Sequence, residues 1–246
     1  MADWNDPRTT GVTPAATVGV PRAARDAGLR SYMLSVYNYM ASGVLLTGII
    51  AMLFAPYAQG VLMAPGGGMS LLGWIVTLSP LGFVFAMSFG VNRMSTSTLQ
   101  ILFWAFAAVM GLSMSTLFIV FTGVSIAQTF FATAAAFAGL SLWGYTTKRD
   151  LSGFGTFLIM GVVGLLVAML INLFLQSSAM ALAISAIGVL LFAGLTAYDT
   201  QRIKSMYFYV QGTEMMGKTV IMGALSLYLD FINMFQFLLS FMGDRR

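Results

Sequence analysis

GLTAYDTQ (residues 194–201) and LSLYLDFIN (residues 225–233) each place one carboxylate, Asp199 and Asp230, inside a long apolar segment. The chain has 8 acidic residues, and only these two fall within predicted apolar helices. A carboxylate in a membrane-spanning helix costs about 2.5–3.5 kcal/mol on insertion scales, and it faces the interior of a bundle rather than lipid. The two segments therefore predict a helical bundle with a polar site inside it.

The composition places this bundle in a membrane. Hydrophobic side chains make up 59% of the 246 residues, and charged side chains make up 8%. Soluble domains carry about 25% charged residues, because these residues cover much of their surface. We therefore predict an all-α integral membrane protein.

Seven segments are long enough to cross a membrane, which takes about 20 mostly apolar residues. They are residues 32–55, 71–91, 99–121, 125–145, 154–176, 179–203 and 219–242. We expect one compact seven-helix transmembrane domain over residues 31–243. A disordered cytoplasmic tail over residues 1–30 would precede it, and a short tail over residues 244–246 would follow it.

The distribution of lysine and arginine predicts the orientation. These residues occur in the N-terminal tail and in alternate connections, at 91–98, 146–153 and 202–218, and the connections in between have none. The positive-inside rule then places the N-terminus in the cytoplasm. Seven crossings leave Arg245 and Arg246 outside, against the rule. Either the basic residues of the tail and the other connections determine the orientation despite these two charges, which we favour, or the last helix does not fully cross.

The chain contains neither cysteine nor histidine. Their absence excludes disulfides, iron–sulfur clusters and zinc sites built on nitrogen or sulfur. It also argues against a hydrolase, since no histidine base can activate a nucleophile. A bound metal would be a hard cation held by oxygen, and calcium is the natural candidate. No nucleic-acid motif accompanies the basic residues, so we expect no nucleic-acid partner.

Polar residues form one face on each of the two carboxylate-bearing helices. The sixth segment carries Ser185, Thr196 and Asp199, and the seventh carries Ser226, Asp230, Asn233, Gln236 and Ser240. Both faces must avoid lipid, and the simplest arrangement turns them toward each other. We expect Thr196, Ser226 and Asn233 to support the carboxylate pair.

Two neighbouring carboxylates in a low dielectric do not both ionise easily, so they titrate as one coupled unit. Such a pair holds a shared proton near neutral pH and loses it as pH rises. A divalent cation competes for the same oxygens. A second interpretation makes Asp199 an interfacial residue, solvated from the cytoplasm and paired with Arg202 at i+3. The residue pattern leaves both interpretations open.

Three stretches resemble one known family. GYTTKRDLSGFGTFLIMG (144–161), LLFAGLTAYDTQRIKSMY (190–207) and ALSLYLDFINMFQFLLSFMG (224–243) are similar to the Bax inhibitor-1 family, also called the transmembrane BAX inhibitor motif family. The resemblance covers residues 30 to 243. It implies a bacterial member in the cell (inner) membrane, with the last of seven transmembrane helices central and wrapped by the other six.

The resemblance also implies a function, a pH-sensitive passive calcium (cation) leak channel. Asp199 and Asp230 match the family's proton-sharing pair, which would hold protons or calcium as the permeant ion, with no cofactor. A basic residue late in the second helix would latch the closed state by pairing with these carboxylates, and Arg93 is the only one near that place. The alternative interpretation makes Arg93 a positive-inside loop residue.

A second function class stays open beside the channel. Some bacterial relatives resemble modulators of membrane proteases, and eukaryotic members are linked to the suppression of cell death. In that case the chain would be a membrane interaction protein whose transport has no physiological relevance. Neither function is enzymatic.

Overall fold

A computed structural model describes residues 22–246, with their side chains from residue 26 onward. The described chain is helical and contains no strand. Its helices are α1 (Arg22–Leu62), α2 (Leu71–Gly90), α3 (Thr96–Met114), α4 (Leu117–Val120), α5 (Gly123–Thr146), α6 (Ser152–Leu175), α7 (Ser178–Val210) and α8 (Met215–Met242). Counting α3 and α4 together, seven of these helical segments are long and apolar enough to cross a membrane. The predicted seven-helix membrane fold is thus confirmed.

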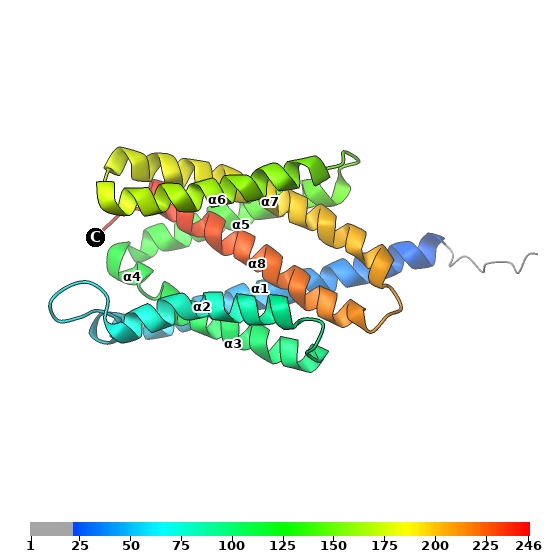
Figure 1. Ribbon diagram of the computed structural model, residues 1–246, viewed down its shortest axis with the longest axis horizontal. Coiled ribbons are helices and arrows are strands. Elements are labelled where there is room, and N and C mark those ends of the chain that lie inside the picture. The colour runs from blue at the N-terminus through cyan, green and yellow to red at the C-terminus, as the bar shows by residue number, and fades with distance from the viewer. Residues whose placement is uncertain (1–21) are drawn as a thin grey trace, which may run out of the picture.

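Helix α8 runs through the middle of the bundle, and it packs against α1, α3, α5 and α7 (Figure 1). Its side chains at Ala224, Leu227, Tyr228 and Leu239 are fully buried. The predicted central position of the last helix is confirmed. The structure refines the predicted wrapping, because α2 and α6 lie at the periphery, where they pack chiefly against α3 and α7.

Helix starts in the described chain follow a common local rule. Ser70, Ser95, Thr122 and Ser177 precede α2, α3, α5 and α7, and each side-chain oxygen accepts a hydrogen bond from the backbone N–H three residues later. Such caps satisfy backbone donors that the first turn of a helix leaves free. They matter more in a membrane, where unpaired backbone groups are costly.

The third crossing differs from the continuous helix predicted over residues 99–121. The helix breaks after Met114 and resumes as the short α4. At the break, the Ser115 hydroxyl donates to the Leu112 carbonyl at 2.6 Å, and the Thr116 hydroxyl donates to the Ser113 carbonyl at 2.8 Å. Such local side-chain bonds compete with helical backbone bonds, which explains the interruption.

Two helices extend beyond their predicted ends. Helix α1 begins at Arg22, so the prediction of a disordered tail is wrong for residues 22–30, and the rest of that tail lies outside the described residues. Helix α7 continues to Val210, so much of the predicted 202–218 connection is also helical. The extensions pack on each other, since the rings of Tyr32 and Tyr207 lie 5.4 Å apart. A side chain at Gly28 would collide with Tyr207, so glycine allows this close approach.

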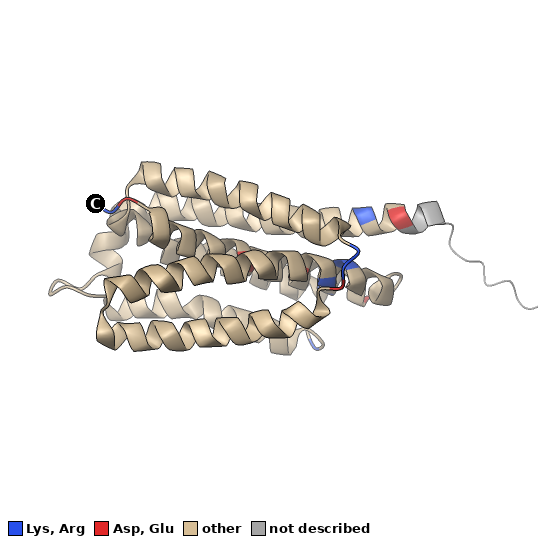
Figure 2. Ribbon diagram, turned by 90° about the horizontal axis from the view of Figure 1, so that it is seen from above, with Lys and Arg blue, Asp and Glu red and all other residues tan. Residues whose placement is uncertain are grey.

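Apart from Arg245 and Arg246 at the C-terminus, the described lysines and arginines lie toward the end of the bundle where α1 begins, and the C-terminus lies at the opposite end (Figure 2). Helix α8 is 28 residues long, which at about 1.5 Å per residue spans about 42 Å. That length is enough to cross the hydrocarbon core of a bilayer, about 30 Å thick. The fold therefore supports a full last crossing, and the direction of insertion stays a prediction.

The C-terminal residues are tied to the bundle. The backbone N–H of Asp244 donates to Ser125 Oγ at 2.9 Å, and the Asp244 carbonyl accepts from Thr122 N at 3.1 Å. The Arg246 N–H donates to the Val120 carbonyl at 2.9 Å. These bonds fix the end of α8 against the α4–α5 connection.

Candidate functional site

Asp230 lies in the middle of α8 and is only 4% exposed. Its Oδ2 atom is buried and has no hydrogen-bond partner among the described residues. Seven residues before Asp230, Gly223 of α8 packs on Ile203 of α7. Seven residues after it, Phe237 of α8 packs on Gly188 of α7. Residues seven apart share a helix face, so Asp230 lies on the face of α8 that packs against α7.

Asp199 is half-buried on α7 and lies close enough to Asp230 for their charges to interact. The two carboxylates thus lie on facing helices, α7 and α8, and no hydrogen bond joins their side chains among the described residues. Arg202 is also near enough for its charge to act on Asp199. Asp199 therefore lies between the buried carboxylate and a basic residue, and both sequence interpretations describe part of its surroundings. The shared proton stays a prediction.

The other members of the YDTQ segment each hold a different part of the bundle. Tyr198 covers Gly155 of α6, where any side chain would collide with the tyrosine ring. Gln201 Oε1 accepts a hydrogen bond from Leu151 N, and Gln201 Nε2 donates to the Arg149 carbonyl, both at 2.8 Å. These contacts fix the rotation of α7 against α6 and the α5–α6 connection. They thereby set the direction in which Asp199 points.

Thr200 belongs to a chain of hydroxyl groups that joins three helices. The Tyr37 hydroxyl lies 2.6 Å from Ser141 Oγ, which lies 2.9 Å from Thr200 Oγ1, and Thr200 donates to the Thr196 carbonyl at 2.7 Å. Each hydroxyl has one proton. Because Thr200 donates to the carbonyl, Ser141 must donate to Thr200, and Tyr37 must donate to Ser141. The bonds therefore run in one direction, from α1 through α5 to α7.

A second polar junction lies two residues before Asp230. The Thr47 hydroxyl donates to the Ala107 carbonyl at 2.8 Å, and Tyr228 OH lies 2.6 Å from Thr47 Oγ1. Since Thr47 uses its proton for the carbonyl, Tyr228 is the donor in the second bond. All three partners are buried. The junction joins α1, α3 and α8 and holds the Asp230 turn of α8 in place.

The predicted supporting residues satisfy their hydrogen bonds differently from the expectation. Thr196 Oγ1 donates to the Phe192 carbonyl, and Asn233 Nδ2 donates to the Leu229 carbonyl, both at 2.8 Å and both within the same helix. Ser226 is half-buried on α8. Side chains of this kind readily bond to the carbonyl four residues back. Thr196 and Asn233 therefore do not bond across the α7–α8 interface, and Asp230 Oδ2 has no partner among the described residues.

Arg93 is exposed in the turn between α2 and α3. No ion pair joins it to Asp199 or Asp230 in the described part of the chain. The structure thus brings the two carboxylates together but leaves Arg93 apart from them. Its role as a latch stays a prediction.

A metal at this site would find two side-chain carboxylates. No group of three His, Cys, Asp or Glu side chains able to hold a metal occurs in the described chain. Calcium takes six to eight oxygen ligands, so carbonyl and water oxygens would have to complete its shell. A site with only two carboxylate side chains suits a weakly bound, exchangeable cation better than a permanent structural one.

Residues Thr47, Tyr37 and Tyr228 were missed by reasoning from the sequence. Each lies in an apolar helix, so composition does not distinguish it from an interfacial anchor. One signal was present for Tyr228, because it stands two residues before the only carboxylate in the middle of a helix. The partners, 104 and 181 residues apart in two of these bonds, could be found only from the fold.

Comparison with known proteins agrees with this architecture. Residues 29–246 match the model of a family described as inhibitor of apoptosis-promoting Bax1. The chain is 47% identical over 222 residues to an uncharacterized protein of Rickettsia prowazekii, covering 90% of this chain and 92% of the relative. It is 44% identical over 222 residues to the inner membrane protein YbhL of Escherichia coli, covering 89% and 94%. With a family match over nearly all of the described residues, the chain belongs to the Bax inhibitor-1 family.

Proposed function

We propose that this chain is a passive calcium (cation) leak whose opening responds to protons held by Asp199 and Asp230. The observation that carries the proposal is Asp230 itself, a buried carboxyl group with an unpartnered oxygen next to a second carboxylate. An ionised carboxylate in the interior needs a compensating partner. A proton or a cation shared with Asp199 supplies one.

The protonation state sets the direction of the expected response. At low pH a shared proton leaves the pair with a single negative charge, and the two groups tolerate each other at short range. As pH rises the proton leaves, the carboxylates repel each other across the α7–α8 interface, and the site attracts divalent cations more strongly. Calcium occupancy of the site should therefore increase with pH, and the packing of α7 against α8 should change with it.

The membrane assignment extends this proposal. The relative from Escherichia coli is named an inner membrane protein, and we assign this chain to the same kind of membrane. The basic end of the bundle, seen in Figure 2, would face the cytoplasm by the positive-inside rule. Asp199, next to Arg202, would then lie nearer the cytoplasmic side than Asp230. The chain would act as a non-enzymatic conduit.

The test is calcium flux into proteoliposomes across pH for the native chain, Asp199→Asn, Asp230→Asn and the double variant. Asparagine keeps the shape of the side chain but removes its ionisable group. Each single variant should flatten the pH dependence of flux between roughly pH 6 and 8 and weaken calcium binding. Folding should survive, because the substitution removes a buried charge and does not create one.

Asp150→Asn is the matched control. Asp150 is fully exposed in the α5–α6 connection, and hydrogen bonds from the side chain and backbone of Ser152 lower its pKa below the ordinary value of 3.8. It stays ionised throughout the tested range, so its loss changes the net charge without changing the titration. A double Asn variant at Asp199 and Asp230 whose flux still titrates like that of the native chain would refute the proposal. That result would favour an interaction protein that modulates a membrane protease or a stress response.

A further inference from the structure

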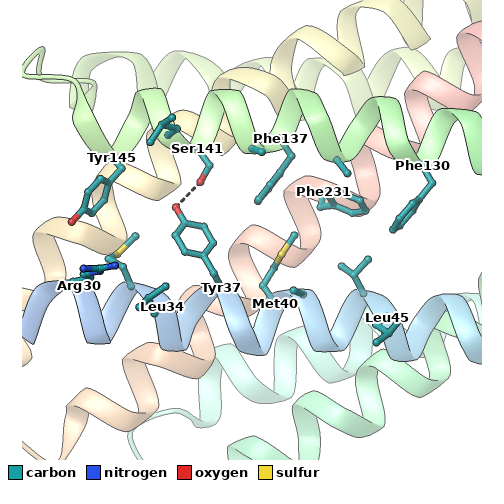
Figure 3. Close-up of a pocket in the computed structure, with 16 residues that line it drawn as sticks. Arg30, Leu34, Tyr37, Met40, Leu45, Phe130, Phe137, Ser141, Tyr145 and Phe231 are labelled. Carbon is teal, nitrogen blue, oxygen red and sulfur yellow. Dashed lines mark hydrogen bonds between the residues drawn. The ribbon is translucent and has the colours of Figure 1, made fainter.

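A long groove lies between α1 and α5, and neither Asp199 nor Asp230 lines it. Its main cavity has a volume of about 730 Å³, and Phe231 of α8 contributes to its lining (Figure 3). This volume lies within the roughly 300–1,000 Å³ typical of ligand sites. Leu34 and Leu142 on its edges are exposed on the outside of the bundle. The groove therefore opens toward the lipid.

The groove has the length and the chemistry of a lipid chain. Its lining extends along α1 from Arg30 to Leu45, 15 residues apart, which corresponds to about 22 Å of helix. One leaflet contributes about 15 Å of hydrocarbon to a bilayer. Beyond Leu45, a second cavity of about 360 Å³ continues the groove and shares Phe130 and Phe231 with the first. The walls are aliphatic and aromatic, so hydrocarbon is their natural complement.

One end of the groove is polar and positively charged. Arg30 is exposed at this end, across from Tyr145 of α5 (Figure 3). Lys204 donates to the Tyr145 carbonyl at 2.7 Å, and its ammonium lies 4.8 Å from the centre of the Tyr145 ring. No acidic residue lines the cavity, and Asp26 lies one turn before Arg30 on α1. One cation, Arg30, thus lies at the mouth of an apolar channel, and Lys204 of α7 is held against Tyr145 of its wall.

A hydrogen bond marks the change from the polar to the apolar part. Tyr37 and Ser141 meet across the groove at 2.6 Å, between Arg30 and the aromatic lining formed by Phe137 and Phe130 (Figure 3). Ester and glycerol oxygens of a lipid are found at this depth, between the phosphate and the acyl chains. The groove thus passes from a cation through a polar stretch to hydrocarbon, which is the order of polarity along a phospholipid, while the Tyr37 and Ser141 protons stay in the chain that runs to Thr200.

We propose that this groove binds an anionic glycerophospholipid from the leaflet at the Arg30 end. One acyl chain lies against Met40, Phe137 and Phe130, and the phosphate lies against Arg30. A free phosphate ion would leave the apolar walls uncovered, and a neutral hydrocarbon would leave Arg30 without an anionic partner. Only an amphiphile with an anionic head satisfies both parts of the groove. This inference does not depend on the calcium leak.

The test is native mass spectrometry of the full-length chain in detergent, titrated with phosphatidylglycerol or with zwitterionic phosphatidylcholine. The native chain should bind one phosphatidylglycerol at least about fivefold more tightly than phosphatidylcholine, since a basic residue near anionic lipid contributes attraction of that order. Arg30→Gln should reduce that preference by about fivefold. Arg149→Gln, which removes an exposed charge at the same end but outside the groove, should not.

A second pair of variants tests the apolar part. Ala138 lines the groove, whereas Ala136 is exposed on the same helix outside it. Ala138→Phe should abolish the tight phosphatidylglycerol adduct, and Ala136→Phe should retain it. Equal binding of the two lipids, or equal binding by Ala138→Phe and Ala136→Phe, would overturn the proposal. So would a dimer of the native chain that Ala138→Phe dissociates without any loss of lipid, because the groove would then hold a second copy.

Discussion

Helices α6 and α8 show opposite relations between apolar character and burial. Helix α6 is the most hydropathic of the seven crossings, yet only 11% of its most apolar 18-residue stretch is buried, against 67% in the less hydropathic α8. In water the more apolar helix would occupy the core. In a membrane, lipid is as apolar as leucine, so apolar surface can face outward without penalty. Polar and small residues therefore indicate the interior here, and hydropathy indicates the periphery.

The largest expected effect comes from truncating one leucine in each helix. Leu239 of α8 is fully buried, and Leu173 of α6 is 68% exposed. Leu239→Ala leaves a cavity and should lower the free energy of unfolding by about 2–5 kcal/mol. Leu173→Ala should change it by less than about 0.5 kcal/mol. Unfolding by denaturant in detergent micelles measures both, and equal losses would mean that α6 is also covered in the protein.

A smaller contrast is expected for two helical glycines. A side chain at Gly144 of α5 would collide with the backbone of Ala197 on α7, whereas a side chain at Gly164 of α6 would meet nothing within 4 Å. Gly144→Ala should push these helices apart and destabilise the fold by about 1–3 kcal/mol. Gly164→Ala should stabilise it by up to about 1 kcal/mol, since alanine favours the helix. Thermal unfolding of the two variants gives the sign of each effect. A stable Gly144→Ala would show that α5 and α7 are less closely packed than described.

The smallest effect should come from removing one hydroxyl. Tyr228→Phe deletes the bond to Thr47 but leaves the Thr47 bond to the Ala107 carbonyl. Hydrogen bonds between transmembrane helices contribute about 0.6 kcal/mol on average, and up to about 1.7. Tyr209→Phe is the control, because Tyr209 is 84% exposed. If both variants unfold identically in the same assay, the junction does not stabilise the central helix.

Sequence reasoning succeeded where one helix could be treated alone. The membrane fold and seven crossings followed from composition and segment length, because lipid imposes the same length on each helix. It failed at Ser115, where local side-chain bonds interrupt a helix, and at Gly28 and Tyr207, where two helix extensions stabilise each other. Hydropathy reports only the part of a helix inside the membrane. It therefore places the start of α1 too late and the end of α7 too early.

The candidate site, too, was predictable from the sequence only in part. The energetic cost of a carboxylate in lipid was enough to predict that Asp230 faces the interior, and it left Asp199 open between an interior and an interfacial position. That cost does not say which helix each one faces or how its neighbours are satisfied. Thr196 and Asn233 bond within their own helices, an outcome that a polar stripe in the sequence does not distinguish from contacts between helices. The lipid-facing groove also left no sequence signal, because its lining is ordinary apolar residues.

The sequence by itself determined that the protein is a seven-helix membrane bundle with two carboxylates kept away from lipid. Both properties follow from the lipid surroundings, which impose the same requirements on each helix separately. Only the tertiary structure decided that Asp199 lies near Asp230, that Tyr37 reaches Thr200 through Ser141, and that a groove remains between α1 and α5. These features depend on how the helices rotate against one another. Close packing at a few small residues sets that rotation, and no single segment contains the information.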